Sequence, residues 1–261
     1  MDSKKVINHI TKWLDDYSKN SNTNGYVLGI SGGIDSAVTS TLAARTGRPL
    51  LCVEMPIHQA ENQVSRASDH IEWLMKKFPN VIRKKVPLTE AFETMKKAFG
   101  ETNSKNHALA LANTRARLRM TTLYYEAGLS GGLVVGTGNK VEDFGVGFFT
   151  KYGDGGVDLS PIADLMKSDV YALAKEFNII DSIQNAAPTD GLFGDNRTDE
   201  DQIGASYPEL EEMMSYLANG NKGEELSGRK LEVYKIYSRL NRANQHKMIP
   251  IPVCKIPESM R

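Results

Sequence analysis

The stretch GYVLGISGGIDSAV, residues Gly25–Val38, determines the architecture of this chain. Its apolar residues Tyr26–Ile30 form a short run that is typical of a buried strand. Two consecutive glycines follow, and Ser36 then offers a good N-cap for a helix that is expected to begin there or at Ala37. The stretch therefore predicts a strand, a tight turn with little side chain, and a helix in direct succession.

The same alternation of strand and helix continues along the chain. Further strands are expected at Leu50–Met55, Asn80–Val86 and Leu133–Gly136, and helices at Gln59–Phe78, Thr89–Phe99, Asn106–Ala127 and Lys167–Phe177. Most of these strands are nearly continuous in apolar residues, which favours a sheet covered on both sides. The predicted fold class is α/β, a doubly wound parallel sheet with helices on both faces. A single domain is expected over residues 1–261, with a helical C-terminal part at Pro208–Gln245.

Composition narrows the class of protein. The 261 residues carry 32 basic and 32 acidic side chains, so the net charge is zero, which argues against broad binding to nucleic acid or to an acidic membrane. The two cysteines, Cys52 and Cys254, lie too far apart for zinc-ligand spacing. No apolar stretch reaches the ~18 residues of a membrane span. We expect a soluble, cytoplasmic protein with no nucleic-acid and no membrane partner.

The turn SGGIDS, Ser31–Ser36, has the properties of an anion cradle. Glycines allow backbone N–H groups to approach a ligand, and the start of a helix adds free donors and a positive dipole end. Asp35 would repel phosphates unless a magnesium ion lies between them. The turn lacks the lysine of a Walker A loop, which suits pyrophosphate as a leaving group. The alternative is an ordinary strand–helix turn in which Asp35 and Ser36 only cap the helix.

Three further motifs carry charged residues. In NTRARLRM, Arg117 points away from the flank shared by Arg115 and Arg119, and it is the better candidate for an anionic ligand; a solvated helix face is the alternative. In VVGTGNKVED, Glu142 follows a strand end and is a candidate to join Asp35 in holding magnesium, unless it is a capping carboxylate. Lys167 begins a helix, where it opposes the helix dipole, and this suggests that it serves an anion.

The order of these motifs resembles a known family. SGGIDS is similar to the pyrophosphate loop of the N-type ATP pyrophosphatases. The segments GISGGIDSAV, ARLRM, FFTKYGDGGVDLSPIADLMKSDVYALA, APT, RTDEDQIGASYPELEEMM and HKMIPIP occur in the order found in ammonia-dependent NAD synthetases. The resemblance spans nearly the whole chain, and TKYGDGGVDLSPI is its most specific segment. One departure is Met248, which follows His246 and Lys247 where the family often has arginine.

The resemblance implies an activity and a set of site residues. The family converts deamido-NAD to NAD with ammonia, ATP and Mg²⁺, through an acyl-adenylate. The resemblance implies that ATP is bound by Gly29, Ile30, Ser31, Gly32, Gly33, Ile34, Asp35, Ser36, Thr137, Lys167 and Thr189. It implies that deamido-NAD is bound by Arg117, Lys151, Asp158, His246 and Lys247, and the metal by Asp35 and Glu142. The catalytic residues would be Asp35 and Lys167, and Asp154 is a candidate to deprotonate ammonium.

Two alternatives remain at this point. The first alternative to an NAD synthetase is another ATP pyrophosphatase, which would act on a different acid or on tRNA. The second is a nucleotide sensor without enzymatic activity. The neutral charge and the lack of a cysteine motif weigh against tRNA thiolation, and the pair Asp35 and Glu142 weighs against a sensor. No cysteine has a nearby catalytic partner, so free ammonia is the expected nitrogen source.

The resemblance also implies a homodimer formed through the helix Asn106–Ala127. Leu109, Ala112, Ala116, Met120 and Leu123 follow one face, and Leu111, Leu118 and Tyr125 the opposite face. Two opposed apolar stripes predict that the helix is covered on both sides, by its own sheet and by a second subunit or a helix of the same chain. The segments Gly153–Gly156 and Phe193–Asp201 are expected to be mobile without ligand and to close over it.

Overall fold

A parallel sheet forms the centre of the molecule. The computed structural model describes residues 1–189 and 198–261, and it contains one four-stranded sheet in the order β3-β2-β1-β4. The strands are β1 (Tyr26–Gly29), β2 (Leu50–Glu54), β3 (Val81–Lys85) and β4 (Leu133–Val134), and every neighbouring pair is parallel. β1 lies between β2 and β4, so its C-terminal end, and the turn that follows it, opens at the middle of the sheet edge.

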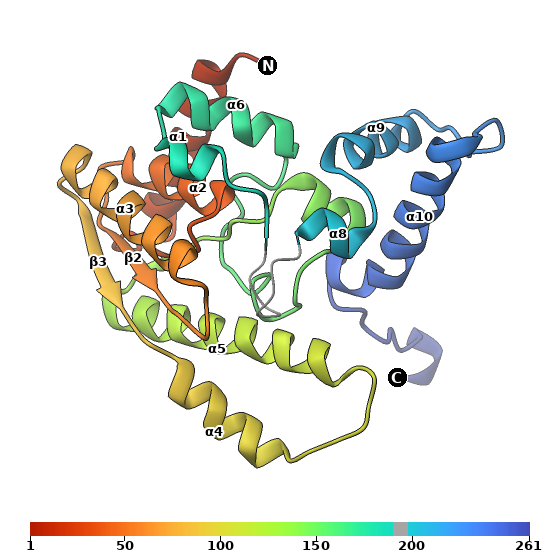
Figure 1. The fold of residues 1–261 in the computed structure, drawn as a ribbon, viewed down its shortest axis with the longest axis horizontal. Coiled ribbons are helices and arrows are strands. Elements are labelled where there is room, and N and C mark those ends of the chain that lie inside the picture. The colour runs from red at the N-terminus through yellow and green to blue at the C-terminus, as the bar shows by residue number, and fades with distance from the viewer. Residues whose placement is uncertain (190–197) are drawn as a thin grey trace.

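Helices cover both faces of the sheet, as predicted. On one face, α1 (Ser3–Asn20), α2 (Ile34–Ala44), α3 (Glu61–Lys77) and α6 (Lys167–Phe177) contribute the main apolar cluster, which includes Leu14, Leu42, Leu74 and Leu173. On the other face, α4 (Thr89–Phe99) and α5 (His107–Ser130) pack through residues such as Phe92 and Ala127. In Figure 1, α4 and α5 lie below the strands and α2 and α3 above them. The α/β class with a doubly wound sheet is confirmed.

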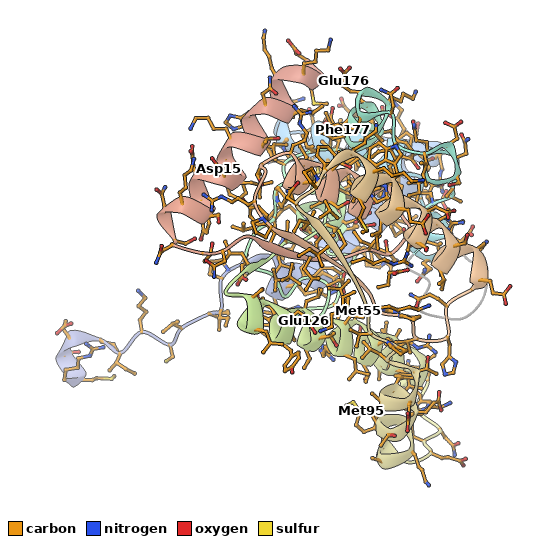
Figure 2. All side chains as sticks on the ribbon, turned by 90° about the vertical axis from the view of Figure 1, so that its left-hand side faces the viewer. Asp15, Met55, Met95, Glu126, Glu176 and Phe177 are labelled. Carbon is orange, nitrogen blue, oxygen red and sulfur yellow. The ribbon has the colours of Figure 1, made fainter. Side chains whose placement is uncertain are left out.

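The C-terminal residues form a second apolar cluster. It joins η1 (Val141–Val146), a single π-helical turn, to α9 (Tyr207–Ala218) and α10 (Gly228–Met248). Shorter elements are α7 (Asp181–Gln184), α8 (Asp199–Ile203) and η2 (Glu258–Met260). Figure 1 shows α9 and α10 beside the sheet rather than on either of its faces. The tail after α10 is exposed and extends away from the body (Figure 2).

One local expectation was wrong. The first helix after the glycines begins at Ile34 with Gly33 as its N-cap, so Ser36 lies inside α2 and does not cap it. Its hydroxyl donates to the Gly33 carbonyl at 2.9 Å, because the helix starts as soon as the glycines have turned the chain. The end of Phe193–Asp201 enters α8, where Thr198 forms a capping box with Asp201, and the mobility of this segment without ligand stays a prediction. Residues 193–197 of that segment lie outside the described residues.

Two of the three residues in the second stripe of α5 are covered by its own chain, and Tyr125 is not. Leu111 and Leu118 pack on the cluster that contains Phe92 of α4, so an intramolecular helix accounts for them. The large apolar side chains that α5 leaves exposed are Leu109 of the first stripe and Tyr125 of the second, together with Tyr124 and Leu129. Leu118 is therefore partly buried against this cluster, and a charge placed there would disturb the packing of α5 on α4. No helix within residues 1–189 and 198–261 has the length and apolar character needed to cross a membrane.

A buried histidine makes the stability of this fold sensitive to acid. His70 of α3 is fully buried, and its Nε2 lies 3.0 Å from the Ser40 hydroxyl of α2. Burial is the main reason that the pKa of His70 is lowered to about 4. A histidine in the unfolded chain has a pKa of about 6.5. Below that pH the unfolded chain binds a proton at this residue, while the folded chain does not until the pH approaches 4. The free energy of unfolding should fall as the pH drops from about 6.5 towards 4.

We expect this one group to remove about 2 kcal/mol of stability between pH 7.5 and pH 5, at ~1.4 kcal/mol for each pH unit below 6.5. The test compares urea unfolding of wild type and His70→Gln at both pH values. The variant should lose less stability on acidification by roughly that amount. His9→Gln, at an exposed position of α1, is the matched control and should behave as wild type. An unchanged acid dependence in His70→Gln would contradict the assignment.

Candidate functional site

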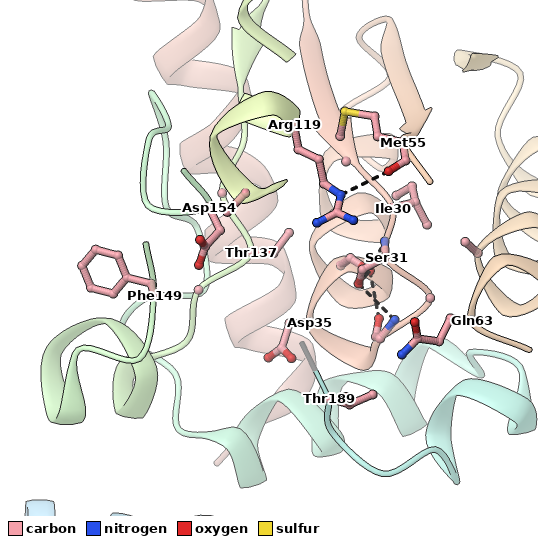
Figure 3. Close-up of a pocket in the computed structure, with 18 of the residues that line it drawn as sticks. Ile30, Ser31, Asp35, Met55, Gln63, Arg119, Thr137, Phe149, Asp154 and Thr189 are labelled. Carbon is pink, nitrogen blue, oxygen red and sulfur yellow. Dashed lines mark hydrogen bonds between the residues drawn. The ribbon is translucent and has the colours of Figure 1, made fainter. Parts of the chain in front are cut away.

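A large pocket opens where the strands end. It is lined by the turn after β1, by the residues after β2 and β4, and by parts of α3, α5 and η1. Carboxyl ends of parallel strands are the usual ligand-binding edge of such a sheet. Figure 3 shows Ser31, Asp35, Thr137, Asp154 and Thr189 arranged around this space. The whole segment Gly29–Ser36 lines the pocket, and so do Thr137, Glu142, Asp154, Lys167 and Thr189.

The SGG turn has a shape that only glycine allows at one position. Gly32 has a φ of +82°, and a Cβ atom there would lie 2.6 Å from the Gln63 carbonyl oxygen of α3. The turn therefore packs directly on α3. The Ser31 hydroxyl receives the Gly33 N–H at 3.2 Å, and the Ser31 and Ser36 hydroxyls lie 3.1 Å apart. This arrangement directs the N-terminal end of α2 towards the pocket, as the sequence predicted for an anion cradle.

Lys167 lies between two carboxylates at the floor of the pocket. Its Nζ donates to Asp35 Oδ2 at 2.5 Å and to Glu142 Oε1 at 3.2 Å, and its side chain is 3% exposed. Burial alone would lower the pKa of Lys167, but the charges of Asp35 and Glu142 outweigh it and the net pKa is raised. The ammonium group therefore stays charged. The three residues come from α2, η1 and α6, which are far apart in the sequence.

The two carboxylates fit a magnesium ion. Both bind the same ammonium nitrogen, so Asp35 and Glu142 converge on one position that already accommodates a cation. Within residues 1–189 and 198–261, no group of three or more metal-ligating side chains occurs. Mg²⁺ is commonly held by one or two carboxylates, with phosphate oxygens and water completing its coordination. The donor set therefore fits a metal that arrives together with a nucleotide, rather than one held by the protein alone.

Two residues that sequence reasoning missed hold this cluster in place. Asn139 is fully buried; its Nδ2 donates to Asp35 Oδ1 at 3.1 Å and its Oδ1 receives the Glu142 N–H at 3.2 Å. The Tyr207 hydroxyl donates to Glu142 Oε1 at 2.5 Å, and its ring lies 4.6 Å from Lys167 Nζ. Asn139 lies within the segment VVGTGNKVED, three residues before Glu142, and an amide side chain beside a carboxylate is the signal that points to it. Tyr207 comes from α9, and nothing in its local sequence indicates the pocket.

A second acidic pair, Asp143 and Asp154, also lines the pocket. Asp154 is exposed as a residue, but its carboxylate receives the Thr150 N–H at 3.0 Å and is partly shielded from water by the protein, which raises its pKa. Burial, together with the charges of Glu142, Asp154 and Asp35, raises the pKa of Asp143 to about 7. The carboxylate of Asp143 is packed against Gly138, where a Cβ atom would lie 2.2 Å from Oδ1. The glycines of Gly153–Gly156 also pack closely, since a Cβ on Gly155 would meet the Phe149 ring at 2.4 Å.

The arginines of α5 divide differently from the expectation. Arg119 lines the pocket and donates from Nε to the Met55 carbonyl oxygen at 3.1 Å, as Figure 3 shows. Arg117 does not line the pocket; its Nη2 donates to the Lys151 carbonyl oxygen at 3.3 Å. Arg115 lies over the Phe92 ring, 4.7 Å from its centre. The helical wheel separated Arg117 from the other two correctly, but the pocket is on the side of Arg119.

The residues expected to bind deamido-NAD lie beside the pocket rather than in its lining. Arg117 contacts Lys151, and Lys151 Nζ in turn donates to the His246 carbonyl oxygen. Lys247 Nζ donates to the carbonyl oxygens of Gly147 and Phe149, each at 2.7 Å. These four cationic or polar residues therefore form one continuous group. Asp158 is separate from them and is occupied by bonds from the Val134 N–H at 2.8 Å and the Tyr124 hydroxyl at 3.0 Å.

Comparison with known proteins supplies the family. The model of the NAD synthase family matches residues 6–250. An NH3-dependent NAD(+) synthetase of Mesoplasma florum is 36% identical over 237 residues, which are 90% of this chain and 93% of that protein.

Two solved structures share the fold over almost their full length. The NMN synthetase of Francisella tularensis superposes with a TM-score of 0.83 at 30% identity, over 99% of both chains. An NH3-dependent NAD synthetase of Campylobacter jejuni, solved with a nitrate ion, gives 0.77 at 26% identity, over 98% of this chain and 100% of that one. The likeness therefore includes the C-terminal helices as well as the sheet.

Proposed function

This chain belongs to the NAD synthase family, and from that premise we propose that it amidates deamido-NAD with ammonia, using ATP and releasing AMP and pyrophosphate. The observation that carries the proposal is the position of Lys167 between Asp35 and Glu142, beside the SGG turn. A cation and two convergent carboxylates next to an anion cradle suit a nucleotide whose outer phosphates leave as pyrophosphate. A protein that only sensed the nucleotide would not need a cation and two carboxylates at the outer phosphates.

The first step joins the acceptor to the adenylate. A carboxylate oxygen of the nicotinate ring attacks the α-phosphorus of ATP; the bond from that phosphorus to the bridging oxygen breaks, and pyrophosphate leaves. The SGG turn and the N-terminal end of α2 bind the phosphates, and Lys167 stabilises the negative charge that develops on them. A magnesium ion bound by Asp35 and Glu142 would neutralise phosphate charge. The protein supplies position and charge, so no side-chain nucleophile is needed.

The second step forms the amide. Ammonia attacks the activated carbonyl carbon, the bond from that carbon to the phosphate oxygen breaks, AMP leaves with the bonding electrons, and the new C–N nitrogen loses one proton to water. Ammonium must first lose a proton, and Asp154 is the group we assign to accept it, because its carboxyl faces the pocket and shielding from water raises its pKa. Arg117, Lys151, His246 and Lys247 would contact the anionic groups of the dinucleotide from the side of the pocket that they border.

One assay tests the whole proposal. The protein is incubated with ATP, Mg²⁺, ammonium chloride and deamido-NAD, and NAD and AMP are quantified. We expect the two products in equal amounts, with AMP formation dependent on deamido-NAD. Glutamine in place of ammonium should give no comparable NAD, since among the described residues the cysteines are one buried in β2 and one exposed in the tail. AMP formed only with a different acid would favour another amidating enzyme, and no AMP at all would favour a sensor.

A mononucleotide acceptor is the second candidate. It is favoured by the likeness to an enzyme named NMN synthetase, with a TM-score of 0.83 over 99% of both chains. The nicotinate carboxylate is common to nicotinic acid mononucleotide and deamido-NAD, so the pocket chemistry described above serves either compound. The same assay decides between them when kcat/KM is measured for both acceptors. A ratio that favours the mononucleotide by tenfold or more would replace the first proposal.

We further propose that the chain forms a homodimer through α5. Its exposed apolar side chains are Leu109, Tyr124, Tyr125 and Leu129. Tyr125 is 63% and Leu129 65% exposed, and adjacent large apolar residues of this kind mark protein interfaces. A two-fold axis beside one helix brings identical patches together. Arg117 and Tyr124 lie on the same helix, next to residues expected to bind the dinucleotide, so the partner would border that part of the site.

The dimer is tested by placing a charge at its expected centre. Tyr125→Glu should convert a dimer into a monomer in sedimentation velocity at micromolar concentration, and should lower the activity with deamido-NAD at the same time. Burying an unpaired carboxylate is the physical reason for the dissociation. Tyr17→Glu, at a 44% exposed position of α1, is the matched control and should remain dimeric. A wild-type monomer with full activity would contradict the proposal.

A further inference from the structure

Helix α3 brings a positive charge to the SGG turn. The helix packs against the turn so closely that a Cβ atom on Gly32 would lie 3.3 Å from Arg66 Cβ. Arg66 Nε donates to the Gly32 carbonyl oxygen at 3.3 Å, and Arg66 lines the same pocket as the turn. The guanidinium is therefore held beside the cradle by the backbone of the cradle itself.

Arg66 differs from the structural arginines of this protein. Arg48, Arg83 and Arg229 each bind a carboxylate at 2.6–2.7 Å. For Arg66, no carboxylate lies within ion-pair distance among residues 1–189 and 198–261, and its one hydrogen bond uses Nε. The two terminal nitrogens, Nη1 and Nη2, remain as donors. A half-buried guanidinium in a ligand pocket, without a counter-ion from the described chain, is arranged for an anionic ligand.

The charge of the bound phosphates favours a further cation next to the turn, in addition to Arg119, which also lines the pocket. The turn lacks a Walker lysine and brings Asp35 instead, while Lys167 is engaged by Asp35 and Glu142. The outer phosphates of ATP carry most of its negative charge, and backbone donors alone neutralise only part of it. Arg66 is the cation placed against the turn from the side of α3, away from Lys167 on α6.

We propose that Arg66 is a phosphate-binding residue of the ATP site, and that its terminal nitrogens hold the two outer phosphates that leave as pyrophosphate. The assignment rests on the proposed ATP-dependent function. A Walker loop carries a phosphate-binding lysine within its own motif. In this chain Arg66 would supply the positive charge instead, from a position 30 or more residues after the loop. A guanidinium binds phosphate through two parallel hydrogen bonds, so it also orients the leaving group.

The test separates the outer phosphates from the adenylate. Isothermal titration calorimetry measures the binding of inorganic pyrophosphate with Mg²⁺, and of AMP, to wild type, Arg66→Ala, Arg66→Gln and Arg66→Lys. We expect Arg66→Ala and Arg66→Gln to raise the Kd for pyrophosphate about tenfold or more and to leave the Kd for AMP within twofold. Arg66→Lys should recover part of the affinity. Arg45→Ala, at an exposed position beyond the other end of α2, is the matched control and should bind both ligands as wild type does.

Each alternative outcome is decisive. Glutamine keeps an N–H donor for the Gly32 carbonyl but has no charge. If Arg66→Gln binds pyrophosphate as wild type does, Arg66 only supports the turn and the assignment is overturned. Equal losses for AMP and pyrophosphate would likewise show that the substitution disturbs the whole pocket. If wild type binds pyrophosphate but forms no AMP with any acceptor, the proposed function is wrong. The role of Arg66 is then still decided by comparing pyrophosphate binding between wild type and the Arg66 variants.

Discussion

Lys167→Ala is expected to reduce pyrophosphate–ATP exchange in the presence of deamido-NAD by about 100- to 1000-fold. The variant removes a buried ammonium group that stabilises charge on the phosphates, and it leaves Asp35 and Glu142 facing each other without a cation. Binding of deamido-NAD should change much less, because Lys167 lines the pocket and is bonded to Asp35 and Glu142, whereas the residues expected to contact that substrate lie beside the pocket. The exchange rate and the Kd for deamido-NAD are therefore measured side by side.

The control for this variant is on the same helix. Lys175→Ala removes an exposed lysine from the last turn of α6 and should retain wild-type exchange. A second readout is thermal unfolding with and without Mg²⁺. The Lys167→Ala midpoint should fall without the metal and recover in part with it, since a divalent cation can replace the lost charge between the carboxylates. Exchange within twofold of wild type would show that Lys167 is structural.

Asp35→Asn is expected to lower kcat/KM for ATP by at least about 100-fold while the protein stays folded. Asparagine still accepts the Asn139 amide bond, now 3.1 Å long, and the turn retains its shape because Gly32 and α3 define it. The substitution removes the charge that would bind magnesium and that pairs with Lys167. The Mg²⁺ concentration for half-maximal activity should rise at the same time.

Asp164→Asn is the matched substitution for Asp35→Asn. It also removes a carboxylate that binds a lysine, Lys140, at 2.7 Å, but the Asp164 side chain is 95% exposed, and such pairs contribute little. Circular dichroism of both variants should match wild type. Unchanged activity and unchanged magnesium dependence in Asp35→Asn would remove this residue from the metal site.

The strand–turn–helix core was predictable because its signals are local. Apolar runs, the two glycines and the helix periodicity each depend on neighbouring residues, and β1, α4 and α6 were placed within one residue of their observed bounds. Lys167 was also accessible, since a lysine at a helix start opposes the dipole and needs another reason to be there. The structure supplies that reason in the two carboxylates.

The remaining parts depend on packing between distant segments. Ser36 is a good capping residue by preference, yet the turn places the helix start two residues earlier. Leu118 is apolar at a position that suits a subunit interface, but in the structure it packs on the cluster that contains Phe92 of α4. Arg66 and Tyr207 carry no motif, and only the approach of α3 and α9 to the pocket gives them a role. Periodicity shows that a face is covered, and it does not show what covers it.

Because Tyr207 of α9 binds Glu142, the pocket depends on the C-terminal helices as well as on the sheet. A fragment that stopped before α9 would retain all four strands, the SGG turn and Lys167, yet Glu142 would lose its phenolic donor and η1 would lose most of its apolar cover. The nucleotide half of the site and the C-terminal helices are thus not modules that can be exchanged separately between proteins. Any chimaera that keeps the pocket must cross over outside the contact between η1, α9 and α10.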